Sequence, residues 1–288
     1  MLYRYSLAVA GVAIQMETEQ PLAVTDQFRP FLTEACSADF RVRYRQVDAL
    51  PAIPKTVIYE DQCYRVHPDG KGGYLRSFFY APHVLTPYGV ATSEGNALRV
   101  EYLESGRDSV SGMDGAFFHL GFEKLLIRKD RLCFHAACVQ TSGGGLLFSG
   151  PSGIGKSTQA DLWCRHRGAK QINGDRPILS RTETGWLAWG SPYAGSSRCH
   201  INESCPVSAV VMLRQAPRCA LRRLGSEEAF RAVWSGLTMH SWDEVFVERA
   251  CDLALELIDG VPVYEFACTP DEAAVDYLEG ELRKEARL

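Results

Sequence analysis

Apolar stretches separated by polar turn residues make up the chain from residue 1 to about 105. They are rich in β-branched and aromatic side chains, and Pro, Gly, Asp and Asn punctuate them, which predicts short β-strands. One short helix is expected over 25–35, with Thr25 or Asp26 as its N-terminal cap. The strands are expected within 3–16, 39–47, 55–67, 74–82 and 97–104.

The pattern changes after the small, polar stretch 105–115. Phe117, Leu120, Leu125 and Leu126 lie near helical spacing, and strand-like and helical segments then alternate, which favours an α/β domain. We therefore expect a strand-rich N-terminal domain over 1–108 and an α/β domain over 109–288. Helices are expected near 116–131, 156–167, 226–237, 242–258 and 270–285, and strands at 132–140, 146–150, 170–180, 186–190, 207–215, 220–224 and 261–268.

Composition is that of an ordinary soluble globular protein, with 46% hydrophobic and 23% charged residues in 288. The 31 basic and 35 acidic residues leave a net charge of −4, which gives no electrostatic case for a nucleic-acid partner. No apolar run approaches the ~18 residues of a membrane span. The start could be mistaken for a signal peptide, but acidic residues stand where a cleavage site would be expected, so we expect a cytoplasmic protein.

Cysteine is frequent, with ten residues, and none of them forms a C-x-x-C pair. The signature of a zinc site is therefore missing. In a chain of this size without an export signal, we expect free, mostly buried thiols.

The segment GPSGIGKS at 150–157 fits the pattern G-x-x-x-x-G-K-[ST], between an apolar strand and an amphipathic helix. Glycines let backbone N–H groups approach phosphate oxygens, and the start of the helix faces the same anion. Lys156 would reach the β- and γ-phosphates, and the Ser157 hydroxyl would bind Mg²⁺. The alternative is a glycine-rich turn that precedes a helix by chance. The expected phosphate-binding set is Gly150, Ser152, Gly153, Ile154, Gly155, Lys156, Ser157 and Thr158.

Three further residues are candidates for the chemistry. His135 lies on the strand before the loop strand, and is either catalytic or a core histidine bonded to backbone. Asp175, in INGDRP, either serves the reaction or ends a strand and caps a turn. Arg198 is either a cation on the transferred group or a solvated loop arginine. Small residues at 190–197 suit a loop that closes over substrate, and also suit ordinary loops.

Four segments together resemble the catalytic core of HPr kinase/phosphorylase, which is similar to ATP-dependent phosphoenolpyruvate carboxykinase. They are the histidine strand HAACVQ at 135–140, the glycine turn TSGGG at 141–145, the loop at 150–157 and the acidic motif INGDRP at 172–177. The resemblance covers roughly residues 115–200. The segment INGDRP together with WGSPYAGSSR at 189–198 resembles more closely still the smaller HPr-kinase-like proteins associated with peptide modification. We do not expect the chain to be HPr kinase itself. The resemblance implies an α/β domain with a mixed sheet, with ATP and Mg²⁺ as cofactors and a homo-oligomer as a plausible assembly.

The resemblance also implies roles by position. Lys156 and Ser157 match the phosphate-binding lysine and the metal-binding hydroxyl, and His135 matches a histidine close to the γ-phosphate. Asp175 matches the second acid of an Asp-Asp pair, which binds Mg²⁺ or acts as the base. The first acid of that pair is Gly174 in this chain, so Asp175 has to serve both tasks or another carboxylate has to help.

We therefore expect a kinase that transfers the γ-phosphoryl group of ATP to a hydroxyl, on a serine of a peptide or on a free small molecule such as serine. Asp175, His135, Lys156 and Arg198 are the expected catalytic residues, and Ser157 and Asp175 the metal ligands. The domain over 109–288 would be catalytic, and the strand-rich domain over 1–108 would shape the acceptor site or bind a peptide as an added strand. The alternative function is a nucleotide-binding switch or ATPase that acts through a partner. A carboxykinase-like lyase ranks lower, because its carboxylate-binding arginines have no match here.

Overall fold

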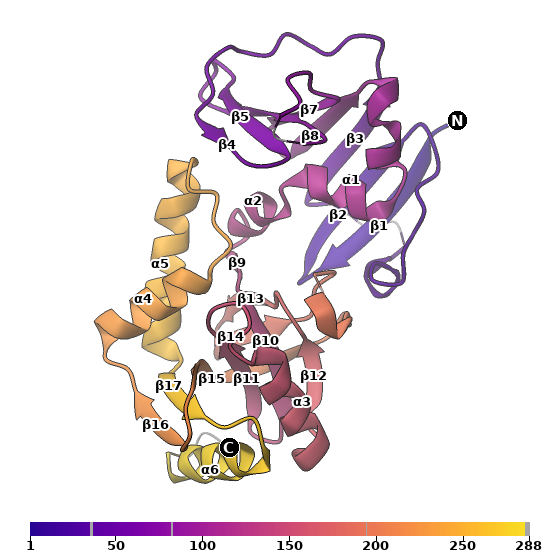
Figure 1. Cartoon of the computed structure of the whole chain (residues 1–288). Coiled ribbons are helices and arrows are strands. Elements are labelled where there is room, and N and C mark those ends of the chain that lie inside the picture. The colour runs from indigo at the N-terminus through magenta and orange to yellow at the C-terminus, as the bar shows by residue number, and fades with distance from the viewer. Residues whose placement is uncertain (35–36, 82, 194, 286–288) are drawn as a thin grey trace. The chain divides into compact units, whose positions relative to one another are not determined.

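The computed structural model describes residues 1–34, 37–81, 83–193 and 195–285. It is a mixed α/β protein that divides into two compact units, Met1–Leu125 and Leu126–Leu288 (Figure 1). Among the described residues, no helix is long and apolar enough to cross a membrane.

The division between the units falls after Leu125, later than the boundary expected after residue 108. The polar stretch expected to link the domains is folded into the first unit. A β-carbon on Gly106 would lie 2.6 Å from the Tyr88 ring, and one on Gly115 would lie 1.9 Å from the Ser109 carbonyl oxygen. Such close packing joins the segment to the first unit.

The first unit is built on an eight-stranded mixed sheet of order β1-β2-β3-β8-β7-β6-β5-β4. The pairs β2–β3 and β3–β8 are parallel and the other pairs antiparallel. The elements are β1 Tyr3–Val9, β2 Val12–Thr18, η1 Arg29–Phe31, β3 Phe40–Gln46, β4 Tyr59–Glu60, β5 Tyr64–Pro68, β6 Tyr74–Phe78, β7 Gly89–Glu94, β8 Ala97–Tyr102, η2 Glu104–Val110, α1 Met113–Leu120 and α2 Phe122–Ile127.

Five local expectations need correction in this part of the chain. The helix expected over 25–35 is only the single 3-10 turn η1, because Leu32 forms a β-bridge with Leu7 and the chain there becomes extended; residue 35 lies outside the described residues. The segments 3–16 and 55–67 are each two strands, and β7 was not expected. The helix expected over 116–131 is two helices, since Gly121 between them has a φ of 58°.

The second unit is built on a nine-stranded mixed sheet in which β15 holds a central place. The start of β15 pairs with β14, and the rest lies parallel to both β11 and β17. The elements are β9 Arg131–Cys133, β10 Ala136–Thr141, β11 Gly144–Ser149, α3 Lys156–Arg167, β12 Lys170–Asn173, β13 Ile178–Thr182, β14 Gly185–Trp189, η3 Gly195–Ser197, β15 Ser204–Gln215, β16 Ala220–Arg223, α4 Ser226–Gly236, α5 Glu244–Gly260, β17 Val263–Cys268 and α6 Glu272–Lys284.

Helices cover both faces of this sheet (Figure 1). Ala137 and Val139 of β10 share a core with α3 and α6, while Ala136 and Cys138 share a second core with α4 and α5. Alternate side chains of a strand point to opposite faces, so both faces are apolar. The expected α/β class and mixed sheet describe this unit correctly.

The cysteines of the described residues are free thiols, as expected. Only some are buried: Cys133, Cys138, Cys205 and Cys268 are enclosed, whereas Cys63 is exposed. Cys36 lies outside the described residues.

Candidate functional site

The 150–157 loop joins β11 to α3. Gly150, Gly153 and Gly155 have φ angles of 140°, 77° and 114°, which favour glycine. A β-carbon on Gly153 or Gly155 would meet nothing within 4 Å, so the space beside their backbone is open. No side chain of the described residues caps α3 and none of its first turn is acidic. The positive end of the helix is therefore available to an anion.

Lys156 lies over this loop. Its Nζ donates to the carbonyl oxygens of Gly150 at 3.0 Å and Pro151 at 3.2 Å. Burial lowers the pKa of the Lys156 ammonium, and the negative charge of Asp175 acts in the opposite direction. The charge of Asp175, in the turn between β12 and β13, therefore acts on Lys156 at the start of α3.

Backbone pairing brings His135 and Asp175 together. The amide of Phe134 donates to the Pro177 oxygen at 3.1 Å, and that of Ala136 donates to the Asp175 oxygen at 2.9 Å. The side chains between these bonds are then neighbours, with His135 Nε2 3.3 Å from Asp175 Oδ1. His135 lies between β9 and β10 rather than within the single strand expected at 132–140.

The imidazole of His135 faces the site and is not a core side chain. It is 39% exposed, while its backbone is held by the Ser149 hydroxyl, which donates to its oxygen at 2.8 Å. Burial lowers the pKa of His135, as do the charges of Lys156 and Arg176, while Asp175 opposes them. His135 is therefore mainly unprotonated at neutral pH.

The side chain of Asn173 holds the backbone of the acidic motif. Its buried Oδ1 accepts from the amides of Asp175 at 2.9 Å and Arg176 at 2.7 Å, and its Nδ2 donates to the Tyr193 oxygen at 3.2 Å. Asn173 thus makes the turn that we considered for Asp175 itself. The carboxylate of Asp175 is left facing His135 and Arg176. Asn173 was not among the residues expected from the sequence, although an Asn two residues before a candidate acid is a signal for such a turn.

Arg176 is the cation beside this carboxylate. Its Nε lies 3.6 Å from Asp175 Oδ2, and its guanidinium lies 5.6 Å from the centre of the Tyr193 ring. Arg198, the arginine expected from the sequence, is exposed in the turn after η3, with a φ of 53°. No contact among the described residues brings the Arg198 guanidinium to Asp175. Sequence reasoning missed Arg176, although it directly follows the candidate acid.

Close packing explains why position 174 is a glycine. A β-carbon on Gly174 would lie 1.7 Å from the Ser197 hydroxyl oxygen, and one on Gly195 would lie 2.7 Å from the Asp175 β-carbon. A β-carbon on Gly190 would lie 1.8 Å from the Ile201 oxygen. Glycine at 174 and at 195 therefore lets Ser197 and Gly195 pack on the acidic motif, and an acid at 174 has no room.

The site offers few side-chain donors for a metal such as Mg²⁺. No group of three or more His, Cys, Asp or Glu within the described part of the chain is arranged to hold a metal. Mg²⁺ is usually held by one or two protein oxygens together with substrate phosphates and waters. By donor type, the Asp175 carboxylate and the Ser157 hydroxyl are oxygens of that kind.

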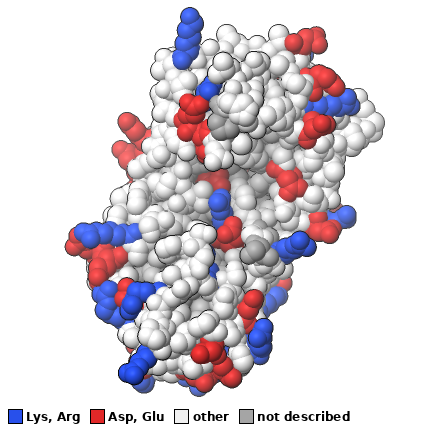
Figure 2. Space-filling view, viewed as in Figure 1, with Lys and Arg blue, Asp and Glu red and all other residues white. Residues whose placement is uncertain are grey.

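Surface charge is mixed. On the face in Figure 2, acidic and basic side chains are interspersed, and the described residues of that face form no broad basic area.

The fold and site define a mixed α/β protein with a glycine-rich loop between a strand and a helix and a His–Asp–Arg cluster beside it. No protein-family model matches the chain, and no curated protein matches it. Among solved structures it is similar to the HPr(Ser) kinase/phosphatase from Coxiella burnetii, at 14% identity and a TM-score of 0.32, over 53% of this chain and 98% of that chain.

Proposed function

We propose that this protein is an ATP- and Mg²⁺-dependent phosphotransferase that phosphorylates a hydroxyl group, on a serine of a peptide or on a free small molecule such as serine. One observation carries the proposal. The Asp175 carboxylate lies 3.3 Å from His135 Nε2, its charge acts on Lys156, and the space beside Gly153 and Gly155 in the loop that leads to Lys156 is open. A phosphate-binding loop with a carboxylate beside it is what transfer to an alcohol requires.

The loop and helix residues would hold the nucleotide. The amides near Gly153 and Gly155 and the start of α3 would bind phosphate oxygens, and Lys156 would turn from its own loop carbonyls to the β- and γ-phosphates. Ser157 and Asp175 would hold the metal, which when bound neutralises charge on the phosphate oxygens.

The cluster around Asp175 would handle the acceptor. Asp175 would accept the proton of the attacking hydroxyl. The unprotonated imidazole of His135 would hold the Asp175 carboxylate in place. Arg176 would place positive charge near the transferred group, the task that the sequence analysis gave to Arg198. Because position 174 has no room for an acid, Asp175 would serve both metal and acceptor.

The proposal is tested by comparing nucleotide binding with transfer. Asp175→Asn should lower transfer from γ-labelled ATP to serine peptides or serine by about 10²-fold or more, because the general base is lost. With EDTA present, so that the metal-binding role of Asp175 does not enter, Asp175→Asn should still bind ATP, whereas Lys156→Ala should weaken ATP binding itself. Hydrolysis to water at an unchanged rate in Asp175→Asn, with no transfer by the unsubstituted protein to any of these acceptors, would instead identify a nucleotide switch.

The two arginines give a second test. Arg176→Gln should lower kcat by on the order of 10²-fold, because a cation next to the reacting group is lost. Arg198→Gln should lower kcat less. Steady-state kinetics on both variants decide between them, and a larger loss in Arg198→Gln would return the role to Arg198.

A further inference from the structure

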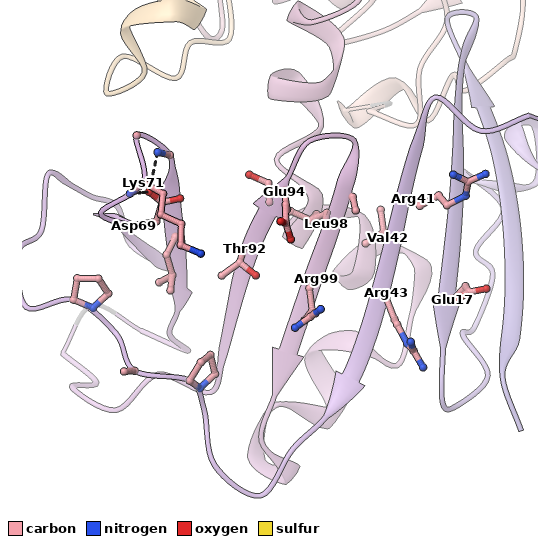
Figure 3. A pocket seen from close by; sticks show the side chains of 18 of the residues that line it. Glu17, Arg41, Val42, Arg43, Asp69, Lys71, Thr92, Glu94, Leu98 and Arg99 are labelled. Atoms are coloured by element: carbon pink, nitrogen blue, oxygen red, sulfur yellow. Dashed lines mark hydrogen bonds between the residues drawn. The ribbon is translucent and has the colours of Figure 1, made fainter.

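A second candidate binding site lies wholly within the first unit. A pocket of about 870 Å³ is bounded by the outward face of the sheet and by the loops around 51–54 and 69–73 (Figure 3). Pockets of roughly 300–1,000 Å³ are the usual size for ligand sites. From the sequence alone, the strand-rich first half is expected to shape the acceptor site or to bind a peptide as an added strand, with no residues assigned to that role.

The floor of the pocket is polar because the strands alternate. On β3, buried and exposed residues alternate: Arg41 and Arg43 are exposed, and Val42 and Tyr44 are buried. On β8, Leu98 and Val100 are buried while Arg99 is exposed. The three arginines therefore share the outward face of the sheet.

Strand register places two of these arginines side by side. In the parallel pair β3–β8, Arg43 is the direct partner of Arg99 (Figure 3). No carboxylate of the described residues forms an ion pair with Arg41, Arg43 or Arg99. Glu17 stands beside Arg43 in register, but its carboxylate pairs with Arg4 at 2.8 Å. Like charges on adjacent strands are destabilising, so this arrangement costs stability unless an anion offsets it.

We infer that this pocket binds an extended acidic peptide segment whose carboxylates stand at alternate residues. Arg41 and Arg43 are two residues apart on one strand, which separates them by about 6.7 Å along it. Alternate side chains of an extended peptide have the same spacing. Arg43 and Arg99 together could hold one carboxylate through two charge-assisted bonds, with Arg41 for the next.

The acidic residues at the border of the pocket favour a peptide over a nucleic acid. Glu17, Asp69 and Glu94 all line it, and they would repel a continuous phosphate backbone. A peptide can instead place neutral or basic residues opposite them.

The walls of the pocket are held by their own local bonds. The Asp69 carboxylate accepts from the amides of Lys71 at 2.7 Å and Gly73 at 2.8 Å, and these bonds lower the pKa of Asp69. Pro51 and Pro54, whose rings fix the backbone, also line the pocket. A site formed before its ligand arrives loses less entropy on binding.

The inference deepens the proposed function and rests on it in one respect, since the bound segment is assigned to the acceptor peptide. Binding itself is tested without nucleotide. Fluorescence anisotropy would compare a labelled peptide with glutamate at alternate positions, the same composition with consecutive glutamates, and a glutamine version. The alternating peptide should bind the full-length protein at least tenfold more tightly than the others.

Variants locate the site. Arg43→Gln and Arg99→Gln should each weaken binding of the alternating peptide about tenfold or more, with Arg43→Lys weakening it less. Arg222→Gln is the matched control, because Arg222 is an exposed arginine in the second unit that pairs with Glu228 at 2.7 Å. It should leave binding unchanged. Circular dichroism of each variant confirms that it is folded.

Several results would overturn the inference: equal binding of the glutamine peptide, unchanged binding in Arg43→Gln and Arg99→Gln, or tighter binding of a short single-stranded DNA. Lys156→Ala should still bind the peptide, because Lys156 belongs to the other site. Peptide binding without any phosphotransfer would support the peptide site and contradict the proposed function. Transfer to free serine without peptide binding would do the reverse.

Discussion

Single positions in the acidic motif are set by contacts with a segment some twenty residues away. Gly174 has a Ser197 hydroxyl where its β-carbon would be, at 1.7 Å, and a Ser197 β-carbon at 2.5 Å. The residue type at 174 therefore reflects space and not chemistry. The carboxylate of Asp175 is not used for the turn, because the Asn173 side chain accepts the hydrogen bonds from the turn amides instead.

This contact predicts a coupled pair. Gly174→Ala should lower the free energy of unfolding by about 1–3 kcal/mol through overpacking, and Ser197→Gly in the same chain should recover part of it. Urea unfolding of the two single variants and the double variant measures the coupling. Gly280→Ala is the control: it lies in α6 with nothing within 4 Å of its added β-carbon, and should stabilise by up to about 1 kcal/mol. Additive effects at 174 and 197 would contradict the contact.

The imidazole of His135 provides a pH test at the same scale. Its pKa is lowered by burial and by Lys156 and Arg176, and raised by Asp175. In metal-free protein with EDTA, Lys156→Met should therefore raise the pKa of His135, and Asp175→Asn should lower it further. NMR titration of the imidazole nitrogens measures both shifts. Lys170→Met is the control: the Lys170 ammonium pairs with Glu203, and its removal should leave the pKa of His135 unchanged.

The sign for stability follows from the same shift. The unfolded chain takes up a proton at His135 more readily than the folded protein, so this residue lowers stability as pH falls below its unfolded value of about 6.5. A rise of the His135 pKa in Asp175→Asn would contradict the geometry.

At the scale of elements, α3 connects the core of the second unit to the 150–157 loop. Trp163 is 1% exposed and packs near Phe148 of β11, with 6.4 Å between the ring centres. Gln159 on the same helix donates to the Thr269 oxygen at 3.0 Å. The first turn of α3, which carries Lys156 and Ser157, is therefore positioned by side chains one and two turns further on.

Trp163→Ala should lower the free energy of unfolding by about 3–5 kcal/mol, because it leaves a cavity under α3. It should also weaken ATP binding, since the start of the helix loses its support. Trp163→Phe should cost less, because the buried Trp163 Nε1 has no hydrogen-bond partner among the described residues. Chemical unfolding and calorimetric titration with ATP test both effects, and unchanged stability in Trp163→Ala would contradict this packing.

At the scale of the whole molecule, the two units carry different spectroscopic signals. All five tryptophans of the chain lie between residues 163 and 242, within the second unit. Tryptophan fluorescence therefore reports the unfolding of that unit, whereas far-ultraviolet circular dichroism reports both.

If the units unfold as separate cooperative bodies, the two signals should give different transitions in urea. On the proposed function, Mg²⁺–ATP at a hundredfold excess over its Kd should stabilise the fluorescence transition by about 2.7 kcal/mol. It should leave the remaining circular dichroism transition in place. Coincident transitions that shift together would show one cooperative molecule.

Much of the second unit could be predicted from local pattern. The helix after the 150–157 loop begins and ends where the sequence placed it, at Lys156 and Arg167. Glycine spacing, a preceding apolar strand and an amphipathic helix are all signals within about twenty residues. The same kind of signal failed over 25–35, where a β-bridge between Leu32 and Leu7 overrode local preference.

The sequence by itself therefore determined the glycine-rich loop, the strand-rich first half and the alternation of strands and helices in the second, because these depend on steric and hydrogen-bonding preferences of neighbouring residues. Only the tertiary structure decided that His135 faces Asp175, that Arg176 and not Arg198 lies beside it, and that Arg43 meets Arg99. Each of these pairs of neighbours, other than Asp175 and Arg176, depends on which strands or loops lie side by side. That choice is made by burial of apolar faces across the whole unit, and no short window of sequence records it.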